Sequence, residues 1–171
     1  MHDDKTVREY IGKFPAYTNL LDTSNPVTLG ALDLQNYYFE HKRQVAEAMK
    51  EAKNIILEVG KDYGKKFGRE YGFFEKYKLD DAEMAIVCLG SLAGSAKAVI
   101  DEYREKGVKI GLLKLRVYRP FPGEEIAKEL EHLKAVAVVE KCDGFAAKGG
   151  PLYDEIRSCL YDKAKKPLIS D

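Results

Sequence analysis

Residues 84–122 read MAIVCLGSLAGSAKAVIDEYREKGVKIGLLKLRVYRPFP. The stretch opens with a continuous apolar run at 84–89, which is typical of a β-strand covered on both faces. A turn of small residues follows, and Ser95 is placed to cap the next helix. Apolar residues then recur at helical spacing until Gly107, which is expected to end the helix in the left-handed conformation. A second apolar strand is predicted at 108–117. Two parallel strands joined by a crossover helix form a right-handed unit, so this stretch predicts an α/β fold.

The same alternation of strands and helices continues to the end of the chain. An amphipathic helix is predicted at 124–133, followed by a buried strand at 135–140. Pro151 suits the first position of another helix, and 167–170 has the character of a last strand. This order predicts a three-layer, mostly parallel α/β sheet over residues 82–171, with its last strand truncated.

The amino-terminal part of the chain has a different character. Residues 1–32 show little periodicity and are interpreted as an extended arm or linker. Residues 33–75 are predicted to form a long helical segment, with Asp33 or Asn36 as its cap. A helix over 36–67 would be about 50 Å long at the usual rise per residue. A domain of this size is narrower than that, so part of the helix should project and pack on something else.

The second half of this helix carries an unusual pattern. Glycines recur every four residues beside an aromatic row, at Gly60, Gly64, Gly68 and Gly72 with Tyr63, Phe67 and Tyr71. Each helical glycine costs about 1 kcal/mol relative to alanine, so the row needs a compensating gain. We interpret it as a contact ridge that lets another backbone approach closely. The alternative is that the helix breaks at Gly60 or Gly64, although an Asp62–Lys66 pair favours its continuation.

Composition limits the classes of function. The chain has 171 residues, of which 45% are hydrophobic and 33% charged, and its 28 basic residues balance its 28 acidic ones. A chain without net charge has no global field for nucleic acid or anionic lipid, so neither partner is expected. No apolar run has the length of a membrane span, and no signal-peptide core is present. Three widely separated cysteines fit neither a disulfide framework nor a zinc or iron–sulfur site, which favours a reduced, cytoplasmic setting.

Two glycine-bearing loops precede helices, where phosphates often bind. The turn at 90–94 lacks the dinucleotide fingerprint because Leu92 occupies the place of the second glycine. It also lacks the Lys-Ser/Thr ending of a P-loop. A plain structural turn is favoured there, with an anion contact as the alternative. The loop at 148–151 likewise presents amides at a helix start, and we favour a structural or interface role over phosphate binding.

Arg116 and Arg119 flank Tyr118 at the carboxyl edge of a predicted strand, where open α/β sheets bind ligands. These arginines could pair with carboxylates across a domain interface, or they could hold a substrate anion. The interface interpretation is the favoured one.

Side chains for nucleophilic catalysis are not arranged in any recognisable motif. The isolated histidines are interpreted as surface or capping residues, and they are His2, His41 and His132. Cys88 lies within an apolar strand and is expected to behave as a small hydrophobic residue, whereas Cys142 is the thiol expected to be exposed. Nucleophilic catalysis therefore finds no support in these residues.

Several of these stretches together resemble a known family. Residues 111–122, GLLKLRVYRPFP, look like a hallmark of domain II of the 2-oxoacid:ferredoxin oxidoreductases, specifically of the α subunit of pyruvate:ferredoxin oxidoreductase. Other stretches match in the same order, at 25–28 with 37–44, 80–83 leading to 89–91, and 149–152. The resemblance covers about residues 25–169, and the ordered set is more specific than any single stretch.

The resemblance implies a domain similar to the carboxyl-terminal domain of transketolase-like enzymes. It also implies a complete enzyme that uses thiamine pyrophosphate, Mg and [4Fe–4S] clusters to decarboxylate pyruvate oxidatively, with coenzyme A accepting the acyl group and ferredoxin the electrons. Branched-chain oxoacids are the alternative substrates. The implied partners are the β, γ and δ subunits, an amino-terminal α-subunit domain and, through the complex, ferredoxin. Anaerobic metabolism is the implied setting.

The chain departs from the family pattern in two respects. It lacks the amino-terminal domain that helps to hold thiamine and substrate in the family, and it lacks the glycine-rich tail that usually follows Ile169. Because the resemblance implies that the α subunit's catalytic residues lie in the missing domain, no catalytic, cofactor-binding or metal-binding residue is assigned here. We therefore expect a domain II fragment with a structural, interface-forming role, no cofactor of its own and no activity in isolation. One alternative is an anion or coenzyme A module built on the turn at 90–94 with Arg116 and Arg119. Another is a free-standing regulatory or assembly protein.

Overall fold

The computed structural model describes residues 2–13, 19–30, 32–145 and 148–171. The chain divides into two compact units, Met1–Lys42 and Arg43–Asp171. Each unit is described by itself.

The first unit contains a helix that the sequence did not predict. Helix α1, Asp4–Ile11, starts after Asp3, whose carboxylate accepts hydrogen bonds from the Thr6 backbone N–H at 3.0 Å and from the Thr6 hydroxyl at 2.7 Å. Gly12 ends the helix with φ +73°. The interpretation of residues 1–32 as wholly extended is therefore wrong over this part, because a short capped helix needs no apolar periodicity to form. Residues 14–18 and 31 of that segment lie outside the described residues.

Helix α2, Tyr38–Phe67, is the predicted long helix. It ends at the predicted residue and begins two positions after Asn36. Asp33, the other proposed cap, lies with its Oδ1 atom 2.6 Å from Nδ1 of His41. The segment predicted as helical to residue 75 is wrong beyond Phe67, because Gly68 takes φ +72° and its N–H binds the Gly64 carbonyl.

The second unit is built on a five-stranded sheet with the order β1-β3-β2-β4-β5. The strands are β1 Phe74–Tyr77, β2 Met84–Leu89, β3 Ile110–Leu115, β4 Ala135–Val139 and β5 Leu168–Ser170. All neighbours pair in parallel except β1, which is antiparallel to β3. The mostly parallel sheet is confirmed, and β1 is an edge strand that the sequence did not predict.

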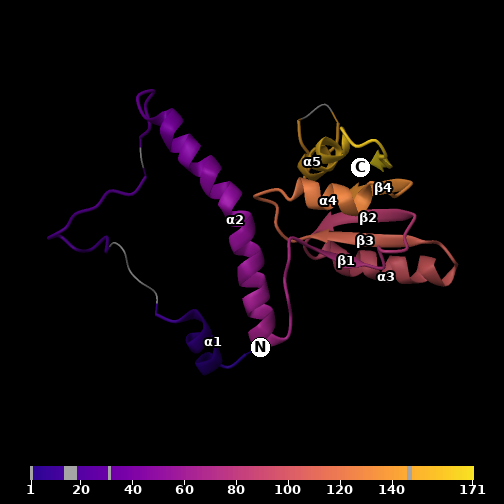
Figure 1. Cartoon of the computed structure of the whole chain (residues 1–171), viewed down its shortest axis with the longest axis horizontal. Coiled ribbons are helices and arrows are strands. Elements are labelled where there is room, and N and C mark those ends of the chain that lie inside the picture. The colour runs from indigo at the N-terminus through magenta and orange to yellow at the C-terminus, as the bar shows by residue number, and fades with distance from the viewer. Residues whose placement is uncertain (1, 14–18, 31, 146–147) are drawn as a thin grey trace. The chain divides into compact units, whose positions relative to one another are not determined.

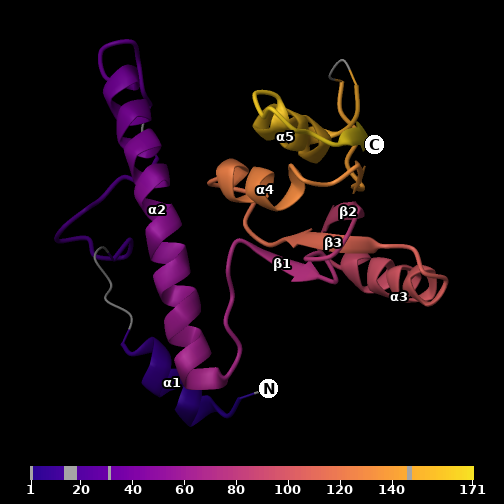
Figure 2. The same cartoon turned by 45° about the vertical axis from the view of Figure 1, so that its right-hand side comes forward.

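Helices cover both faces of the sheet and make three layers (Figure 1). Helix α3, Leu92–Glu105, lies on one face, and α4, Gly123–Leu130, and α5, Pro151–Leu160, lie on the other, as Figure 2 also shows. The larger core lies under α4 and α5 and includes Val87, Leu113, Ile126 and Ile156. The smaller core lies under α3 and includes Cys88, Ile100 and Leu112. Burial on both faces explains the continuous apolar runs of the central strands.

The predicted cap of α3 is wrong. Ser95 lies inside the helix, and the residue at the cap position, Ser91, makes no side-chain cap hydrogen bond. The predicted stop is confirmed, because Gly107 follows the helix with φ +82°.

The four glycines of the predicted ridge have three different structural roles and do not form one ridge. Gly60 and Gly64 lie in α2 against the returning chain, where an added Cβ would meet the Tyr71 carbonyl oxygen at 1.9 Å and the Glu70 Cα at 3.1 Å. Gly68 is the left-handed stop, and Gly72 lies in the extended return toward β1. A backbone does approach closely, but it belongs to this chain. The alternative break at Gly60 or Gly64 is also wrong, because α2 continues through both.

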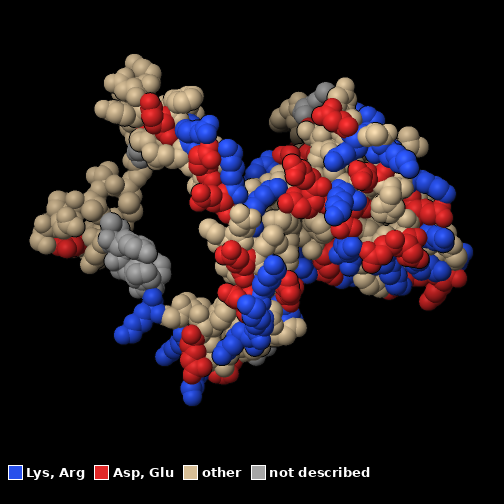
Figure 3. Space-filling model, viewed as in Figure 1, with Lys and Arg blue, Asp and Glu red and all other residues tan. Residues whose placement is uncertain are grey.

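Half of the basic side chains of the second unit form ion pairs within it. Basic and acidic groups are interspersed over the α/β layers on the face shown in Figure 3. Asp62 pairs with Lys65 at 3.0 Å and not with Lys66 as predicted. Lys53 of α2 reaches Glu125 of α4 at 3.2 Å, a pair that links α2 to the α/β layers.

Candidate functional site

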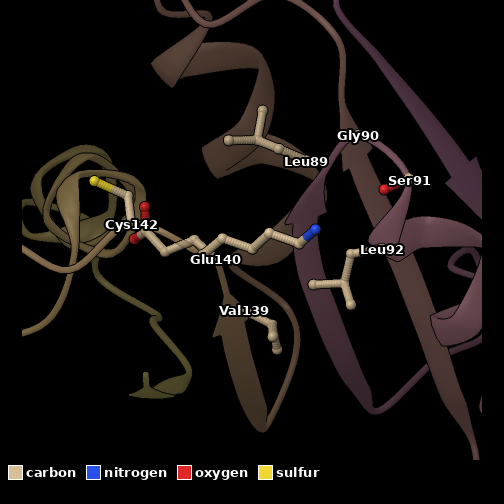
Figure 4. Close-up of a pocket in the computed structure, with 8 residues that line it drawn as sticks. Leu89, Gly90, Ser91, Leu92, Val139, Glu140 and Cys142 are labelled. Atoms are coloured by element: carbon tan, nitrogen blue, oxygen red, sulfur yellow. The ribbon is translucent and has the colours of Figure 1, made fainter.

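A hollow lies where the strand order reverses. β2 is central, with β3 on one side and β4 on the other, so the chain crosses over β2 between them. Ligands of open α/β sheets bind at the carboxyl ends of such strands. A pocket of 290 Å³ occupies this place and is lined by Leu89, Gly90, Ser91, Leu92, Val139, Glu140, Lys141 and Cys142 (Figure 4).

The sequence predicted the turn on one side of this pocket. Gly90 takes φ +63°, which an L side chain rarely adopts, and so turns the chain from β2 toward α3. Figure 4 shows Leu89, Leu92 and Val139 around the hollow, with the Cys142 sulfur on the side away from Ser91. These three aliphatic side chains share the lining with Ser91, Glu140 and Lys141. A phosphate site needs several donors that converge on one point, whereas the charged groups here are one lysine and one carboxylate.

Glu140 has a role that the sequence did not reveal. Its carboxylate accepts hydrogen bonds from the Leu152 N–H at 3.1 Å and from the Tyr153 N–H at 3.0 Å. Both donors lie in the first turn of α5, so the carboxylate caps this helix. A cap supplied from a residue so far upstream has no local sequence signal.

The loop at 148–151 owes its shape to this cap. A Cβ added to Gly150 would lie 2.4 Å from the Cys142 carbonyl oxygen and 2.5 Å from the Glu140 carboxylate. Glu140 thus occupies the place where a phosphate would meet the amides of α5. The geometry supports the structural role of this loop over phosphate binding.

The two arginines pair with carboxylates of their own unit. Arg116 reaches Glu75 at 2.6 Å and lies 4.8 Å from the Tyr71 ring centre. Arg119 reaches Glu155 at 2.5 Å and lies over the ring of Tyr118. The favoured pairing across a domain interface is therefore wrong for both. Glu75 lies on β1, a strand that the sequence did not predict, and Glu155 lies on α5, which only the folded structure brings beside Arg119. Neither arginine lines the pocket at the turn.

The remaining candidates stay apart. His41 pairs with Asp33, and His132 is exposed. Cys88 is buried and Cys142 exposed, as predicted. Burial raises the pKa of the Cys159 thiol to about 11. Within the described ranges, no His, Cys, Asp and Glu side chains gather into a group that could hold a metal ion.

Comparison with known proteins identifies the family. The sequence family described as pyruvate:ferredoxin oxidoreductase core domain II matches residues 82–170. The chain belongs to this core domain II family.

Relatives of this core domain II member carry related names. The chain is 43% identical over 168 residues to pyruvate synthase subunit PorA of Thermotoga maritima, and the match covers 98% of this chain and 43% of that protein. It is 37% identical over 158 residues to ketoisovalerate oxidoreductase subunit VorA of Pyrococcus horikoshii, covering 92% and 40%. The chain therefore spans about two fifths of the length of these relatives.

A solved structure also resembles the chain more distantly. It is a 2-oxoglutarate:ferredoxin oxidoreductase from Magnetococcus marinus with 2-oxoglutarate, coenzyme A and succinyl-CoA bound. The match has a TM-score of 0.47 and 15% identity, and it covers 81% of this chain and 20% of that one.

A second hollow of the core domain II member is an apolar groove along α2. Its volume is 450 Å³, and it is lined by Ile55, Ile56, Val59, Gly60, Tyr63, Tyr71, Gly72, Arg116 and Val117. Val59 is 55% exposed although it faces this groove. The structure describes every residue of α2, and Gly60 is the one residue of this helix that is buried.

The described residues form no helix that has both the length and the apolar character of a membrane span.

Proposed function

We propose that this chain is a non-catalytic, interface-forming part of the α subunit of a thiamine-dependent pyruvate:ferredoxin oxidoreductase. The observation that carries the proposal is the groove along α2, where apolar side chains stay exposed in a member of the core domain II family. Exposed apolar patches of this kind mark protein–protein contacts. The groove would receive the remainder of the α subunit or a β, γ or δ subunit.

The activity of the complete enzyme belongs to this proposal. The assembled enzyme would decarboxylate pyruvate oxidatively in the cytoplasm, pass the acyl group to coenzyme A and reduce ferredoxin. Thiamine pyrophosphate, Mg and [4Fe–4S] clusters would supply the electron-sink and electron-transfer chemistry. The described residues of this chain do not fit a metal or cluster site, so no step of the reaction is assigned to them.

The non-catalytic role predicts how the isolated chain behaves toward thiamine pyrophosphate. Titration calorimetry of the 171-residue chain with thiamine pyrophosphate and Mg²⁺ should give no binding heat at micromolar concentrations. Saturable binding in that range would contradict the proposal.

A charge placed in the groove tests the interface. Val59→Glu should weaken association of the chain with the co-purified remaining parts of the enzyme at least about tenfold, because an unpaired carboxylate would be buried against apolar surface. Asn54→Glu is the matched control, since it adds the same charge to an exposed position of α2 that does not line the groove. Both affinities can be measured by biolayer interferometry. Equal affinities for the two variants would rule out the groove as the docking surface.

The module for anions or coenzyme A is less well supported. Its two arginines are engaged by Glu75 and Glu155, and neither lines the pocket at the turn. The charged residues that line that pocket are Glu140 and Lys141, one of each sign, so the lining favours no particular anion.

A further inference from the structure

A third hollow lies between α5 and the segment that leads into β5. Its volume is 360 Å³, and its lining includes Lys148, Tyr153, Arg157, Tyr161, Lys166 and Leu168. None of these residues lines the pocket at the turn or the groove along α2. Three cations and two aromatic rings therefore share a concave surface that no function described above uses.

The cations of this hollow lack acidic partners. Most arginines of the second unit pair with carboxylates, namely Arg43, Arg104, Arg116 and Arg119. Within the described ranges, Lys148, Arg157 and Lys166 form no ion pair. The two residues before Lys148 are alanines and carry no charge.

Two carboxylates lie near Arg157 without forming an ion pair with it. Asp154 and Asp162 share another surface depression with Arg157, but neither comes within 4.0 Å of its guanidinium. Neither lines the hollow itself. The residues that line the hollow therefore include no carboxylate.

Aromatic rings hold two of the cations in place. The Arg157 guanidinium lies 5.4 Å from the centre of the buried Tyr153 ring, and Nη1 lies 3.5 Å from the Tyr153 hydroxyl. The Lys166 ammonium lies 5.1 Å from the Tyr161 ring centre and donates to the Tyr161 carbonyl oxygen at 2.8 Å. These contacts use few of the available donors, because a guanidinium has five and an ammonium three. The cations are positioned and keep donors for a ligand.

We propose that this hollow binds a nucleoside di- or triphosphate. Its volume is in the range of small-molecule sites. Three cations match the charge of a polyphosphate, and charge-assisted hydrogen bonds to phosphate are among the strong ones. Tyr161 is 73% exposed and Leu168 is 81% exposed, so an aromatic ring and an aliphatic side chain remain accessible to the base. Isolated surface lysines would offer positive charge but no apolar surface against which a base could pack.

Calorimetric titration of the 171-residue chain with ADP tests this site. We expect saturable binding with a dissociation constant below about 1 mM. Arg157→Gln and Lys166→Gln should each weaken ADP binding about tenfold or more, which is the effect of losing a hydrogen bond to a charged group. Lys165→Gln is the matched control, because it removes the same charge from an exposed neighbour that does not line the hollow. This control should bind within about twofold of the unchanged chain.

Further probes identify the source of any binding. Inorganic phosphate and adenosine should each bind at least about tenfold more weakly than ADP, since each offers one half of the ligand. If phosphate binds as tightly as ADP, the site is a simple anion contact. If adenosine binds as tightly as ADP, the affinity comes from stacking of the base alone. Either result overturns the nucleotide assignment, as does equal loss in the Lys165→Gln control. The test uses the isolated chain, so its outcome is separate from that of the subunit-association experiment.

Discussion

Gly60→Ala should destabilise the second unit by about 3 kcal/mol or more, measured as the free energy of unfolding in urea. The added Cβ would lie 1.9 Å from the Tyr71 carbonyl oxygen and 3.0 Å from its carbonyl carbon. Backbone atoms cannot rotate away as a flexible side chain can, so α2 and the returning chain must separate. Their separation would also disturb the apolar groove and the contact between Tyr71 and Arg116.

Gly94→Ala is the matched control for this change. Gly94 is also helical, but a Cβ added there would meet nothing within 4 Å. The same substitution should therefore leave stability unchanged or raise it by up to about 1 kcal/mol, through helix propensity alone. If Gly60→Ala costs no more stability than Gly94→Ala, the close approach of the Tyr71 backbone does not make alanine unfavourable at position 60.

Glu140→Ala is expected to cost about 2 kcal/mol of unfolding free energy. The change removes a carboxylate that accepts from two backbone N–H groups at the start of α5, leaving the donors of two buried residues unsatisfied. It also removes a negative charge from the positive end of the helix dipole. Glu140→Gln should lose less, because one amide oxygen can still accept a hydrogen bond.

Glu105→Ala provides the comparison for Glu140→Ala. Glu105 is an exposed carboxylate at the last position of α3, where a negative charge is unfavourable to the helix dipole. Its removal should change stability by less than about 0.5 kcal/mol. Chemical denaturation of both variants under one condition gives the difference directly. A loss at Glu140 no larger than the loss at Glu105 would show that the long-range cap does not stabilise α5.

The parts of the fold that the sequence predicted correctly carry strong local signals. β2 and β4 are continuous apolar runs because helices cover both faces of the sheet. Gly107 marked the end of α3 through its left-handed conformation, and Pro151 marked the first residue of α5. Each signal depends on a few neighbouring residues.

The errors arose where distant residues decide the structure. β1 has four residues and mixed polarity, and only its pairing with β3 makes it a strand. That pairing brings Glu75 to Arg116, which is why the partner of this arginine was not foreseen. The glycine row kept a regular spacing in sequence although α2 ends in its middle. Periodicity cannot show which backbone approaches a glycine.

The candidate site was predicted only in outline. The turn around Gly90 and the exposure of Cys142 follow from local sequence. The other wall of the pocket comes from the end of β4, and the sequence alone does not place that strand beside β2. The link between Glu140 and α5 likewise depends on the fold that brings them together.

The strand order also has a consequence for biosynthesis. Chain growth from the ribosome delivers β1 first, yet β1 pairs only with β3, which is made after β2. The earliest strand must therefore wait without a partner, while β2 can accept β3 and then β4 as each emerges. Assembly of the sheet would begin at its middle and proceed outward, and the nascent edge strand would be exposed to wrong pairing for longest.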